Sequence, residues 1–372
     1  MIPTNEIAIR PAQLPDLDQL ESLEQRCFDY DQLTRRNFQW MLTKAKASLL
    51  VADYKGKILG YVLVLYHSGT SLARLYSMAV DSENRGLGLG KRLLMVAEDA
   101  ARERNCAYLR LEVRPDNDSA IRLYEACGYR QFEVIPDYYE DHAAARRYEK
   151  RILKYVVHGD RRPVAFYEQS TDFTCGPAAL MMAMHYLNRD IPLEQRTELQ
   201  IWREATTIFM TTGHGGCGPH GLALAAHRRG FDVEIFINQR EPLFVEGVRS
   251  EAKKNVIELV QADFEDQIRR AKMRLRRHSF TLKDIVKALD NGAMPLVLIS
   301  SYRLNKSKSP HWVVITDTDN NYMYVHNPEV DEDAGKTAFD CAHVPILKEE
   351  FERMAQFGSN RLRAMLVLRT KN

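Results

Sequence analysis

The sequence lacks a membrane-spanning segment, a secretion signal, an internal repeat and a low-complexity stretch. No apolar run reaches the length of a bilayer span, and Met1–Glu6 has none of the basic and apolar character of a signal region. The formal net charge is only +2, which argues against a general electrostatic attraction to nucleic acids or membranes. These absences predict a soluble, cytoplasmic protein whose partners are neither membranes nor nucleic acids.

Cysteines are few and scattered along the chain. Their spacing follows none of the patterns of a disulfide framework, which argues against a small secreted domain held together by disulfides. The pattern is typical of free thiols in a reducing compartment. The six cysteines are Cys27, Cys106, Cys127, Cys175, Cys217 and Cys341.

The length of the chain predicts two domains. A chain of 372 residues is too long for one ordinary core, and a composition of 45% hydrophobic and 27% charged residues is typical of globular proteins. Lys154–Pro163 is short, polar and interrupted by a glycine and a proline, as linkers often are. We therefore expect two α/β (α+β) domains, over residues 1–154 and 164–372, joined by a linker over residues 155–163.

Hydrophobic periodicity predicts alternating strands and helices in the first domain. The expected strands cover residues 7–11, 49–54, 58–66, 73–80, 108–113, 129–134 and 147–153. The expected helices cover residues 13–23, 34–46 and 118–127, and a fourth helix follows a glycine-rich loop. The apolar stripe of this fourth helix should face the core, and it comprises Leu89, Leu93, Val96, Ala97 and Ala100.

The glycine-rich loop Arg85–Gly90 reads Arg-Gly-Leu-Gly-Leu-Gly. Its glycines let a ligand approach the backbone, and N–H groups at a helix start attract phosphate oxygens. The glycines alternate, so the loop is not the G-x-G-x-x-G fingerprint of dinucleotide-binding folds. A turn that only closes a strand–helix unit is the structural alternative. The predicted phosphate cradle consists of Arg85, Gly86, Leu87, Gly88, Leu89, Gly90 and Lys91.

The loop fits the R/Q-x-x-G-x-G/A pattern of the GNAT N-acetyltransferases. Residues 111–129 are similar to the RimI-like branch, which acetylates the N-terminal amine of ribosomal proteins. The resemblance covers about residues 1–154 and implies a GNAT fold with a mixed central sheet. It implies acetyl-CoA as co-substrate, with its pyrophosphate in the loop and with Asn117 as a further contact. The pantetheine arm would pair with the main chain of Met78, Ala79 and Val80.

The same resemblance implies two catalytic residues. Tyr124 would protonate the leaving thiolate, and Glu112 would act as the base through a water molecule. An α-amine has a pKa near 7.8, so roughly a tenth of it is neutral at pH 7, against about one in two thousand for lysine. A carboxylate base therefore suffices for a peptide N-terminus. The structural alternatives are a core tyrosine at position 124 and a solvated Glu112 paired with Arg110 or Arg114.

The second domain opens with a cysteine placed as a nucleophile. Cys175 stands at an expected helix start, where the positive end of the helix dipole favours the thiolate. Gln169 can donate its side-chain amide to an oxyanion. His311 begins an apolar strand and is the candidate base, and Asn327 ends the next strand and can orient the imidazole. Asp317 is the rival third member, and a small buried apolar residue is the structural alternative for Cys175.

Three pieces of the second domain resemble the C39 family of papain-like cysteine peptidases: Gln-x5-Cys-Gly-Pro, His-Trp-Val-Val and Asn-Pro. The resemblance covers about residues 164–372 and implies a papain-like fold. It implies Cys175 as nucleophile, His311 as base, Gln169 as oxyanion donor and Asn327 as third member. Many C39 members have aspartate where this chain has Asn327; an amide still orients an imidazole but adds no charge to stabilise it. C39 domains of exporters cut after a Gly-Gly leader beside a membrane-spanning segment, so their substrate is not expected here.

Two other segments of the second domain allow more than one interpretation. His214, Cys217 and His220 have spacings that a zinc site can use, but four ligands are usual, so no metal is predicted. The alternative for this glycine-rich segment is a wall of the peptidase cleft that leads into a helix over Gly221–Ala226. Arg269–His278 is expected to form the basic face of a helix, which is usually only solvated; the alternative is an acidic or nucleic-acid partner.

These patterns predict a bifunctional enzyme that combines an acetyl-CoA-dependent N-acetyltransferase with a cysteine peptidase. The expected acceptor is the amine of a peptide or protein, with the α-amine favoured over lysine or a small amine. Two alternatives stay open: a second domain that binds and presents a peptide without cutting it, and a non-enzymatic regulator that senses acetyl-CoA. The sequence indicates neither the natural substrate nor the oligomeric state.

Overall fold

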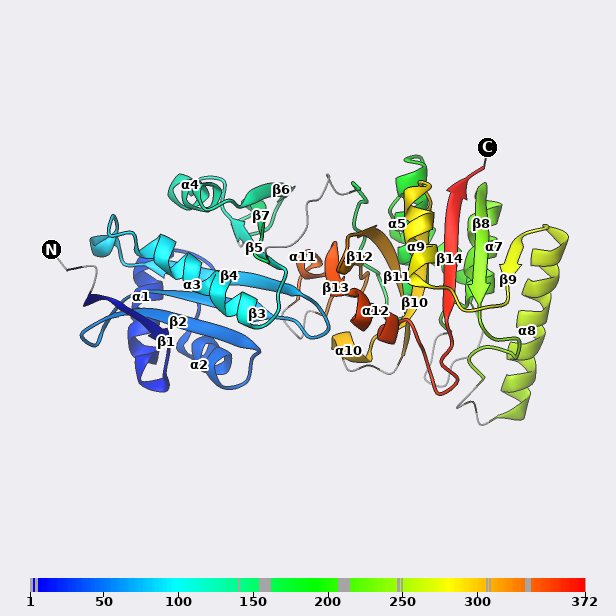
Figure 1. The fold of residues 1–372 in the computed structure, drawn as a ribbon, viewed down its shortest axis with the longest axis horizontal. Coiled ribbons are helices and arrows are strands. Elements are labelled where there is room, and N and C mark those ends of the chain that lie inside the picture. The colour runs from blue at the N-terminus through cyan, green and yellow to red at the C-terminus, as the bar shows by residue number, and fades with distance from the viewer. Residues whose placement is uncertain are drawn as a thin grey trace. The chain divides into compact units, whose positions relative to one another are not determined.

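The computed structural model describes residue 3 and residues 6–139, 141–153, 162–206, 215–245, 248, 250–305, 307, 309–331 and 336–371 (Figure 1). The chain divides into two compact units, Met1–Tyr155 and Val156–Asn372. Most of the predicted linker, residues 155–161, lies outside the described residues. Each unit has its own sheet and its own hydrophobic cores. In the described part of the chain, no helix is both long and apolar enough to cross a membrane.

A seven-stranded mixed sheet with the order β1-β2-β3-β4-β5-β7-β6 forms the first unit, and only β4 and β5 run parallel. The mixed central sheet predicted for this domain is confirmed. The strands are β1 Ala8–Pro11, β2 Ala47–Tyr54, β3 Lys57–Tyr66, β4 Leu72–Val80, β5 Tyr108–Val113, β6 Arg130–Ile135 and β7 Ala145–Arg151. The helices are α1 Leu17–Cys27, α2 Arg35–Thr43, α3 Leu89–Glu103 and α4 Asp118–Ala126, with 3-10 turns over Leu14–Asp16 and Ser82–Asn84.

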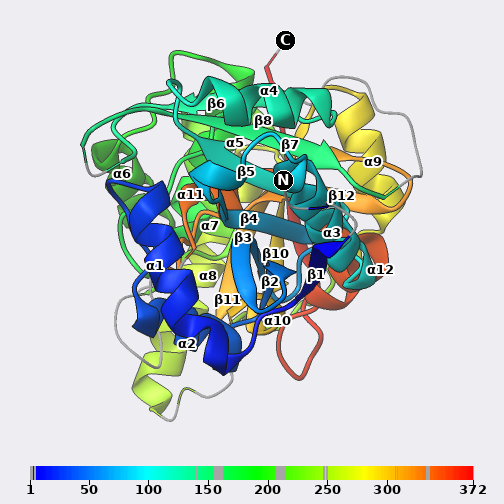
Figure 2. The ribbon, with the colours of Figure 1, turned by 90° about the vertical axis from the view of Figure 1, so that its left-hand side faces the viewer.

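Helices cover both faces of this sheet. Figure 2 shows α1 and α2 on one side of β2, β3 and β4, and α3 on the other side. Successive residues of β3 point to opposite faces, so Tyr61 and Leu63 pack under α1 and α2, whereas Val62 and Val64 pack under α3. The two faces therefore carry separate cores.

The apolar stripe of α3 differs in part from the prediction. Leu89, Leu93 and Ala97 are buried as expected, and Ala101 and Leu94 complete the stripe. The predicted members Val96 and Ala100 are only half-buried. The reason is the helical period: positions four apart, starting from Leu89, keep facing the sheet and arrive at residue 101 rather than 100.

The sheet opens between β4 and β5. The parallel pairing runs from Leu72 with Tyr108 to Leu75 with Leu111 and stops there, although β4 continues to Val80. On its other edge β4 stays paired with β3 as far as Val80, and a bulge at Tyr76 interrupts that register. The bulge increases the local twist of β4, so β4 and β5 separate beyond Leu75. The separation leaves one backbone edge of the end of β4 without a neighbouring strand among the described residues.

The second unit is an α+β domain with its own seven-stranded sheet, in the order β13-β12-β11-β10-β14-β8-β9. Only β8 and β9 pair in parallel. The strands are β8 Phe231–Ile237, β9 Arg274–Arg276, β10 Met294–Ser300, β11 Pro310–Thr318, β12 Tyr322–His326, β13 Val344–Leu347 and β14 Ala364–Thr370. The helices are α5 Cys175–Leu187, α6 Gln195–Ala205, α7 Pro219–Arg228, α8 Glu251–Arg270, α9 Leu282–Asp290, α10 Tyr302–Asn305, α11 Ala338–Cys341 and α12 Lys348–Met354.

Helix α5 is the central helix of this unit. All residues from Gly176 to Met184 are buried, because β10, β11 and β14 lie on one side of the helix and α6 and α7 on another. A Cβ on Gly176 would stand 3.0 Å from Leu222 and 3.2 Å from Trp312. Glycine at this position therefore lets the start of α5, with Cys175, come close to α7 and β11.

The basic run Arg269–His278 does not form one helix, so that prediction is wrong. Helix α8 ends at Arg270, and Lys272 has a φ of 53°, which turns the chain. Arg274–Arg276 then pairs in parallel with β8 and extends the sheet by one strand. The alternation of basic and apolar residues in this short segment fits a strand, and opposite charges on β8 favour the pairing.

Candidate active sites

The glycine-rich loop of the first unit exposes its backbone. Gly86 and Gly88 have φ values of 83° and 72°, in the left-handed region that favours glycine, and a Cβ on either would meet no atom within 4 Å. Gly88 is the N-cap of α3, and the first amide bonded within the helix is that of Arg92, 3.1 Å from the Gly88 carbonyl. In the described structure, the N–H groups of Leu89–Lys91 precede it and are available to an anion. Arg85 is exposed beside them.

The open edge of β4 lies just before this loop. Met78, Ala79 and Val80 pair with β3 on one side, opposite Val62, Tyr61 and Gly60, and have no β5 partner on the other. Backbone groups that point toward β5 from this segment can therefore bond an extended ligand with amide groups, as an added strand would. A pantetheine arm has that shape and those groups, and the phosphate cradle follows a few residues later.

Helix α4 packs against the loop and carries two of the predicted residues. Asn117 is the N-cap of α4, and its Oδ1 accepts from the Ala120 amide at 3.1 Å. Tyr124 is only 5% exposed, packs against Tyr129, and burial raises the pKa of its hydroxyl. In the described part of the chain this hydroxyl has no hydrogen-bond partner. A buried phenol that stays protonated is suited to donate a proton to a leaving group.

Glu112 lies in a buried polar cluster and is not a solvated strand residue. Its Oε2 accepts from Arg74 Nε at 3.1 Å, and the side chains of Glu112 and Arg74 are only 6% and 5% exposed. Arg74 also donates to the Tyr138 hydroxyl at 2.9 Å. The partners named as alternatives are occupied elsewhere: Arg110 pairs with Glu149 and Arg114 with Asp141. Arg74 favours the ionised form of Glu112, which suits a base that acts through water and weakens it as a direct proton acceptor.

The structure places Glu112 and Tyr124 on different faces of the first sheet. Leu111 and Val113 point into the core that contains Tyr124, so the intervening Glu112 points the other way. The gap between β4 and β5 connects the two faces beyond Leu75. An acyl donor on the α4 side and an amine on the Glu112 side would therefore meet in this gap.

Sequence reasoning missed a pair of tyrosines in this cluster. Tyr138 and Tyr139 follow β6 and pack edge to face at 5.0 Å. The guanidinium of Arg114 lies 5.1 Å from the Tyr139 ring, and burial raises the pKa of Tyr139. The available signal was two adjacent aromatics in a short connection between strands. Nothing in the local sequence indicated that this connection folds back to Arg74.

In the second unit, three predicted residues gather at one end of the sheet. Val314 of β11 pairs with His326 of β12, so the start of β11 meets the end of β12. This register brings His311 Nε2 within 2.6 Å of Asn327 Oδ1, and both side chains are buried. The amide oxygen only accepts hydrogen bonds, so Nε2 carries a proton and donates it. The other ring nitrogen, Nδ1, is thereby left as the basic one.

Charge around His311 stabilises the imidazolium. Burial alone lowers the pKa of His311, but the charge of Cys175 and its hydrogen bond to His311 oppose this effect, with smaller contributions from Glu329 and Asn327. The net result raises the pKa to about 9. Glu329 Oε2 lies 3.8 Å from Nδ1, and sequence analysis had not singled out this carboxylate. A cysteine beside a histidine held in this way is the arrangement of a nucleophile and its base.

Cys175 and Gln169 complete the group. Cys175 is the first residue of α5, as predicted for a helix start, and its backbone N–H is among those with no partner inside the helix. The backbone N–H of Gln169 donates to the Pro328 carbonyl at 2.9 Å, which places this segment beside Asn327. Its side-chain Nε2 donates to Thr171 O at 2.9 Å. One N–H of the Gln169 side-chain amide is therefore engaged within its own loop, and the second N–H of the same side chain is available to an oxyanion.

Asp317 does not take part in this group. It lies six residues along β11 from His311, which corresponds to roughly 20 Å of extended chain. Its carboxylate accepts from Arg162 Nη1 at 3.0 Å and from the Thr318 amide at 2.8 Å. The rival third member is thus placed elsewhere, and Asn327 is the residue at the imidazole.

The segment considered for zinc offers no metal site among the described residues. His214 lies outside them. The Cys217 carbonyl accepts from Trp312 Nε1 at 3.0 Å, and burial raises the pKa of the Cys217 thiol. His220 is buried 3.7 Å from Glu265, and burial lowers its pKa to about 4. Helix α7, which this segment leads into, begins at Pro219, two residues before the expected start.

Both units of the chain are similar to known protein families. The profile of the Peptidase_C39 like family matches residues 164–369, and that of the Acetyltransferase (GNAT) family matches residues 14–129. An uncharacterized N-acetyltransferase of Methanocaldococcus jannaschii is 36% identical over 136 residues, 36% of this chain and 84% of that protein. An N-alpha-acetyltransferase of Sulfurisphaera tokodaii is 30% identical over 147 residues, 37% of this chain and 87% of that protein.

Among solved structures, the ribosomal-protein-S18-alanine N-acetyltransferase of Escherichia coli matches with 25% identity and a TM-score of 0.37, over 40% of this chain and 96% of that chain. GNAT enzymes use acetyl-CoA as co-substrate, so acetyl-CoA is the co-substrate of the first unit, which is an N-acetyltransferase. Residues 164–369 make up more than half of the chain. The chain therefore belongs to the Peptidase_C39 like family, and its first unit belongs to the Acetyltransferase (GNAT) family.

Proposed function

We propose that the chain is a bifunctional enzyme that acetylates the α-amine of a peptide or protein and cleaves a peptide bond with Cys175. The observation that carries the peptidase half is the 2.6 Å bond between His311 and Asn327, beside a thiol at a helix start. The observation that supports the acetyltransferase half is the open edge of β4, which leads to a phosphate cradle.

In the acetyltransferase site, the chain's own residues bind, orient and move protons. Residues 85–91 hold the pyrophosphate, the main chain of Met78–Val80 holds the pantetheine arm, and Asn117 contacts the co-substrate at the start of α4. Bound there, acetyl-CoA supplies an activated thioester. Glu112 takes the proton of the attacking amine through water, and Tyr124 donates a proton toward the leaving sulfur.

The buried cluster around Glu112 favours an α-amine as acceptor. Glu112 is engaged in a 3.1 Å ion pair with Arg74, so we propose it as a modest base. An α-amine, with a pKa near 7.8, is already about a tenth neutral at pH 7, whereas a lysine would need a much stronger base. Tyr138 and Tyr139 lie beside Arg74 and offer aromatic surface and a hydroxyl to the first residues of a peptide.

In the peptidase site, Cys175 attacks the scissile carbonyl as a thiolate, and His311 holds the proton and then passes it to the leaving amine. Asn327 keeps the imidazole in the orientation that aims Nδ1 at sulfur. The backbone N–H of Cys175 and the second N–H of the Gln169 amide are the donors for the developing oxyanion. Water then attacks the thioester, with His311 as the base, and the second product leaves.

The rival function is a C39-like domain that binds a peptide and presents it uncut. The arrangement of His311, Asn327 and Glu329 favours the catalytic proposal, because a binding module gains nothing from a buried imidazole with a raised pKa. Perturbed pKa values of this kind are concentrated at functional sites, which favours a catalytic role for this group.

The test is a peptide library incubated with the full chain, with and without acetyl-CoA, and analysed by mass spectrometry. New termini that appear in both samples and vanish with Cys175→Ala support the peptidase. Mass increases of one acetyl group that need acetyl-CoA and fall with Tyr124→Phe support the acetyltransferase. Acetylation without any Cys175-dependent cleavage would favour the presenting domain.

A further inference from the structure

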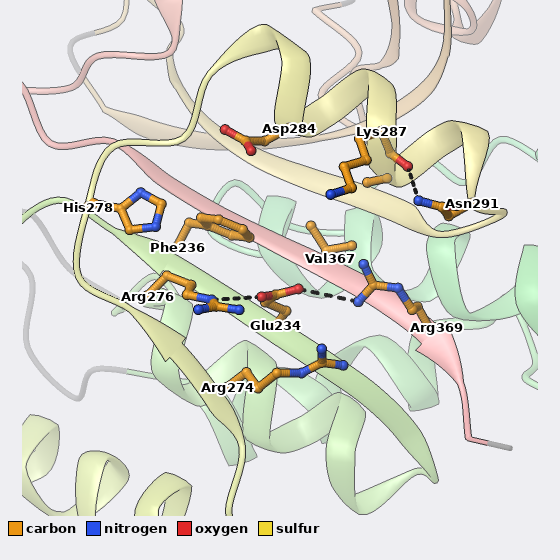
Figure 3. A pocket seen from close by; sticks show the side chains of 11 residues that line it. Glu234, Phe236, Arg274, Arg276, His278, Asp284, Lys287, Asn291, Val367 and Arg369 are labelled. Atoms are coloured by element: carbon orange, nitrogen blue, oxygen red, sulfur yellow. Dashed lines mark hydrogen bonds and ion pairs between the residues drawn. The ribbon is translucent and has the colours of Figure 1, made fainter.

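A cavity of about 390 Å³ lies on the second sheet, where β8, β9 and β14 face helix α9 (Figure 3). Phe236 and Val367 form part of its lining and belong to the core on the α9 side of the sheet. Their neighbours Ile235 and Leu366 point to the opposite face, into the core that includes α5. The cavity therefore lies on the face of the sheet opposite α5, the helix that begins at Cys175.

Strand register gathers three arginines around one carboxylate in this cavity. Glu234 of β8 lies opposite Arg274 of β9, and Phe236 lies opposite Arg276. On the other side, Glu234 lies opposite Val367 of β14, two residues before Arg369. Residues two apart on a strand share a face, so all of these side chains point toward α9. The basic segment Arg269–His278 thus contributes positive charge to the lining of a cavity and not to the face of a helix.

The carboxylate of Glu234 orients Arg276 and Arg369 but does not occupy all of their N–H donors. Glu234 is 8% exposed and accepts from Arg276 Nε at 2.9 Å, with Arg369 Nη1 at 3.5 Å. Arg274 donates instead to Asp232 at 2.7 Å. Since Arg276 is bound through Nε, its terminal N–H groups have no partner among the described residues. Its side chain is 52% exposed, and those groups are accessible from the cavity.

Helix α9 adds a fourth cation from the opposite wall. Lys287 extends over the cavity in Figure 3 and has no ion pair in the described part of the chain. No ion pair joins it to the nearby Asp284 among the described residues, and the Asp284 carboxylate accepts from the Thr281 amide at 2.7 Å and caps the helix. Four cations therefore line a cavity that holds two carboxylates, both already hydrogen-bonded, and the lining carries a net positive charge.

The floor between these cations is apolar. Phe236 and Val367 are buried there, and the His278 ring packs edge to face on Phe236 at 5.6 Å. An ion-pair network on an ordinary solvated sheet surface would have neither a cavity nor an aromatic floor. Small-molecule sites combine such a floor with a few polar groups that fix orientation, and this volume lies within their range.

We propose that this cavity binds a small ligand that carries a phosphate or carboxylate group on an aromatic or aliphatic body. The anionic group lies between Arg276, Arg369 and Lys287, where guanidinium groups match oxyanions in pairs of hydrogen bonds. The body covers Phe236 and Val367. The proposal is independent of both catalytic assignments, since the cavity shares no residue with either site.

Phenyl phosphate is the first probe, and protection from phenylglyoxal is the readout. The full chain is treated with phenylglyoxal at increasing phenyl phosphate, and modification of each arginine is followed by peptide mass spectrometry. We expect protection of Arg276 and Arg369, and none of Arg269, which is 76% exposed outside the cavity. Because the readout is residue by residue, binding of the probe to the Arg85–Gly90 loop does not interfere. Phenylacetate in place of phenyl phosphate distinguishes a carboxylate ligand from a phosphate ligand.

Two variants and a matched control decide the outcome. Lys287→Gln should raise the probe concentration for half-protection about tenfold, the equivalent of losing one charged hydrogen bond, and added salt should raise it further. Arg276→Gln should do the same, and Arg269→Gln should leave it unchanged. If Arg276→Gln lowers the unfolding temperature, the exposed Lys287 remains the deciding position. Equal protection by neutral benzyl alcohol, no protection by either anion, or an unchanged Lys287→Gln would each overturn the proposal.

Discussion

The two candidate active sites differ in how far the chain alone assembles them. In the second unit, His311 and Asn327 are hydrogen-bonded at 2.6 Å, and Cys175 is a direct neighbour of the imidazole. In the first unit, Glu112 and Tyr124 lie on opposite faces of one sheet, joined only by the gap between β4 and β5. The chain alone brings the candidate residues of the second unit together, whereas those of the first unit face each other only across the gap.

The difference follows from the two chemistries. A cysteine nucleophile works only when its base is within hydrogen-bond reach, so the fold must bring the two together before any substrate arrives. Transfer between two bound molecules instead requires a passage in which the acyl donor and the amine meet, with one proton acceptor and one proton donor on its two sides. We therefore expect single substitutions to disable the second site abruptly, and to affect binding and chemistry separately in the first.

The largest expected effect is at His311. His311→Ala should lower peptide cleavage by about 10⁴-fold or more, because the thiol loses its base and its proton donor. Asn327→Ala should cost only about tenfold, the value of one hydrogen bond that orients a ring. Asp317→Asn is the matched control on the same strand and should cleave normally. Cleavage at the wild-type rate by His311→Ala would remove His311 from the mechanism.

Thiol labelling provides an independent check on the same site. Cys175 should react with iodoacetamide faster than the other cysteines, and His311→Ala should slow that reaction at neutral pH. Burial raises the pKa of four of the other thiols, namely Cys27, Cys106, Cys217 and Cys341. If Cys175 labels no faster than these, the second unit is better described as a binding module.

The next effect is at Tyr124. Tyr124→Phe should lower acetyl transfer by about 100- to 10,000-fold at saturating acetyl-CoA and leave the affinity for coenzyme A nearly unchanged, because only the proton donor is lost. Turnover numbers and calorimetry on the same preparation separate the two quantities. The neighbouring Tyr129→Phe is the control, since that ring packs on Tyr124 without a proposed role in proton transfer. Wild-type turnover in Tyr124→Phe would make Tyr124 an ordinary core residue.

Much of the second site could be predicted because local sequence determines it. A helix that begins at Cys175, a strand that begins beside His311 and a strand that ends before Asn327 each follow from nearby residues, and the structure has all three. His311 and Asn327 come together through the antiparallel register of β11 and β12, and the short turn between these adjacent strands largely determines that register. Glu329 was missed because its proximity to His311 is a matter of side-chain placement.

The polar cluster of the first site could not be predicted in the same way. Arg74 meets Glu112 through a parallel pairing of β4 with β5, and the register of parallel strands is set by packing over long stretches of chain. Tyr138 joins them from a connection with no periodic pattern. The basic run Arg269–His278 was misread for a related reason, since helical spacing of charges does not reveal a turn at Lys272.

Gly88→Val should weaken coenzyme A binding by about tenfold, or about 1.4 kcal/mol. The backbone there has a φ of 72°, which valine adopts only with strain, so the loop must change shape and lose its cradle. Gly230→Val is a matched control: its φ is 89°, it also has open space around it, and it lies in the second unit. Calorimetry should show normal coenzyme A affinity for that control. Equal affinities for Gly88→Val and the wild type would separate the loop from the co-substrate.

The smallest effect concerns pH and tests whether the second site carries its charge pair before substrate binds. His311 has a pKa raised to about 9, so its imidazolium is present below that value and is lost as pH rises through it. Cleavage should therefore decline on the alkaline side near pH 9. Because the pKa of an unfolded histidine is near 6.5, the contribution of His311 to stability should also be complete below about pH 6.5 and disappear as pH approaches 9.

Glu329→Gln removes the carboxylate that lies 3.8 Å from Nδ1 and keeps its size. The pKa of His311 should fall, and the alkaline limb of the cleavage profile should move down by about one pH unit, as expected for the loss of one nearby opposite charge. The rate at neutral pH should change little, because His311 stays largely protonated there. Glu349→Gln, at an exposed position on α12, controls for the change in net charge. An alkaline limb that stays in place would mean that Cys175 and Asn327 alone hold the proton on His311, and that the second site is even more self-contained than the comparison with the first implies.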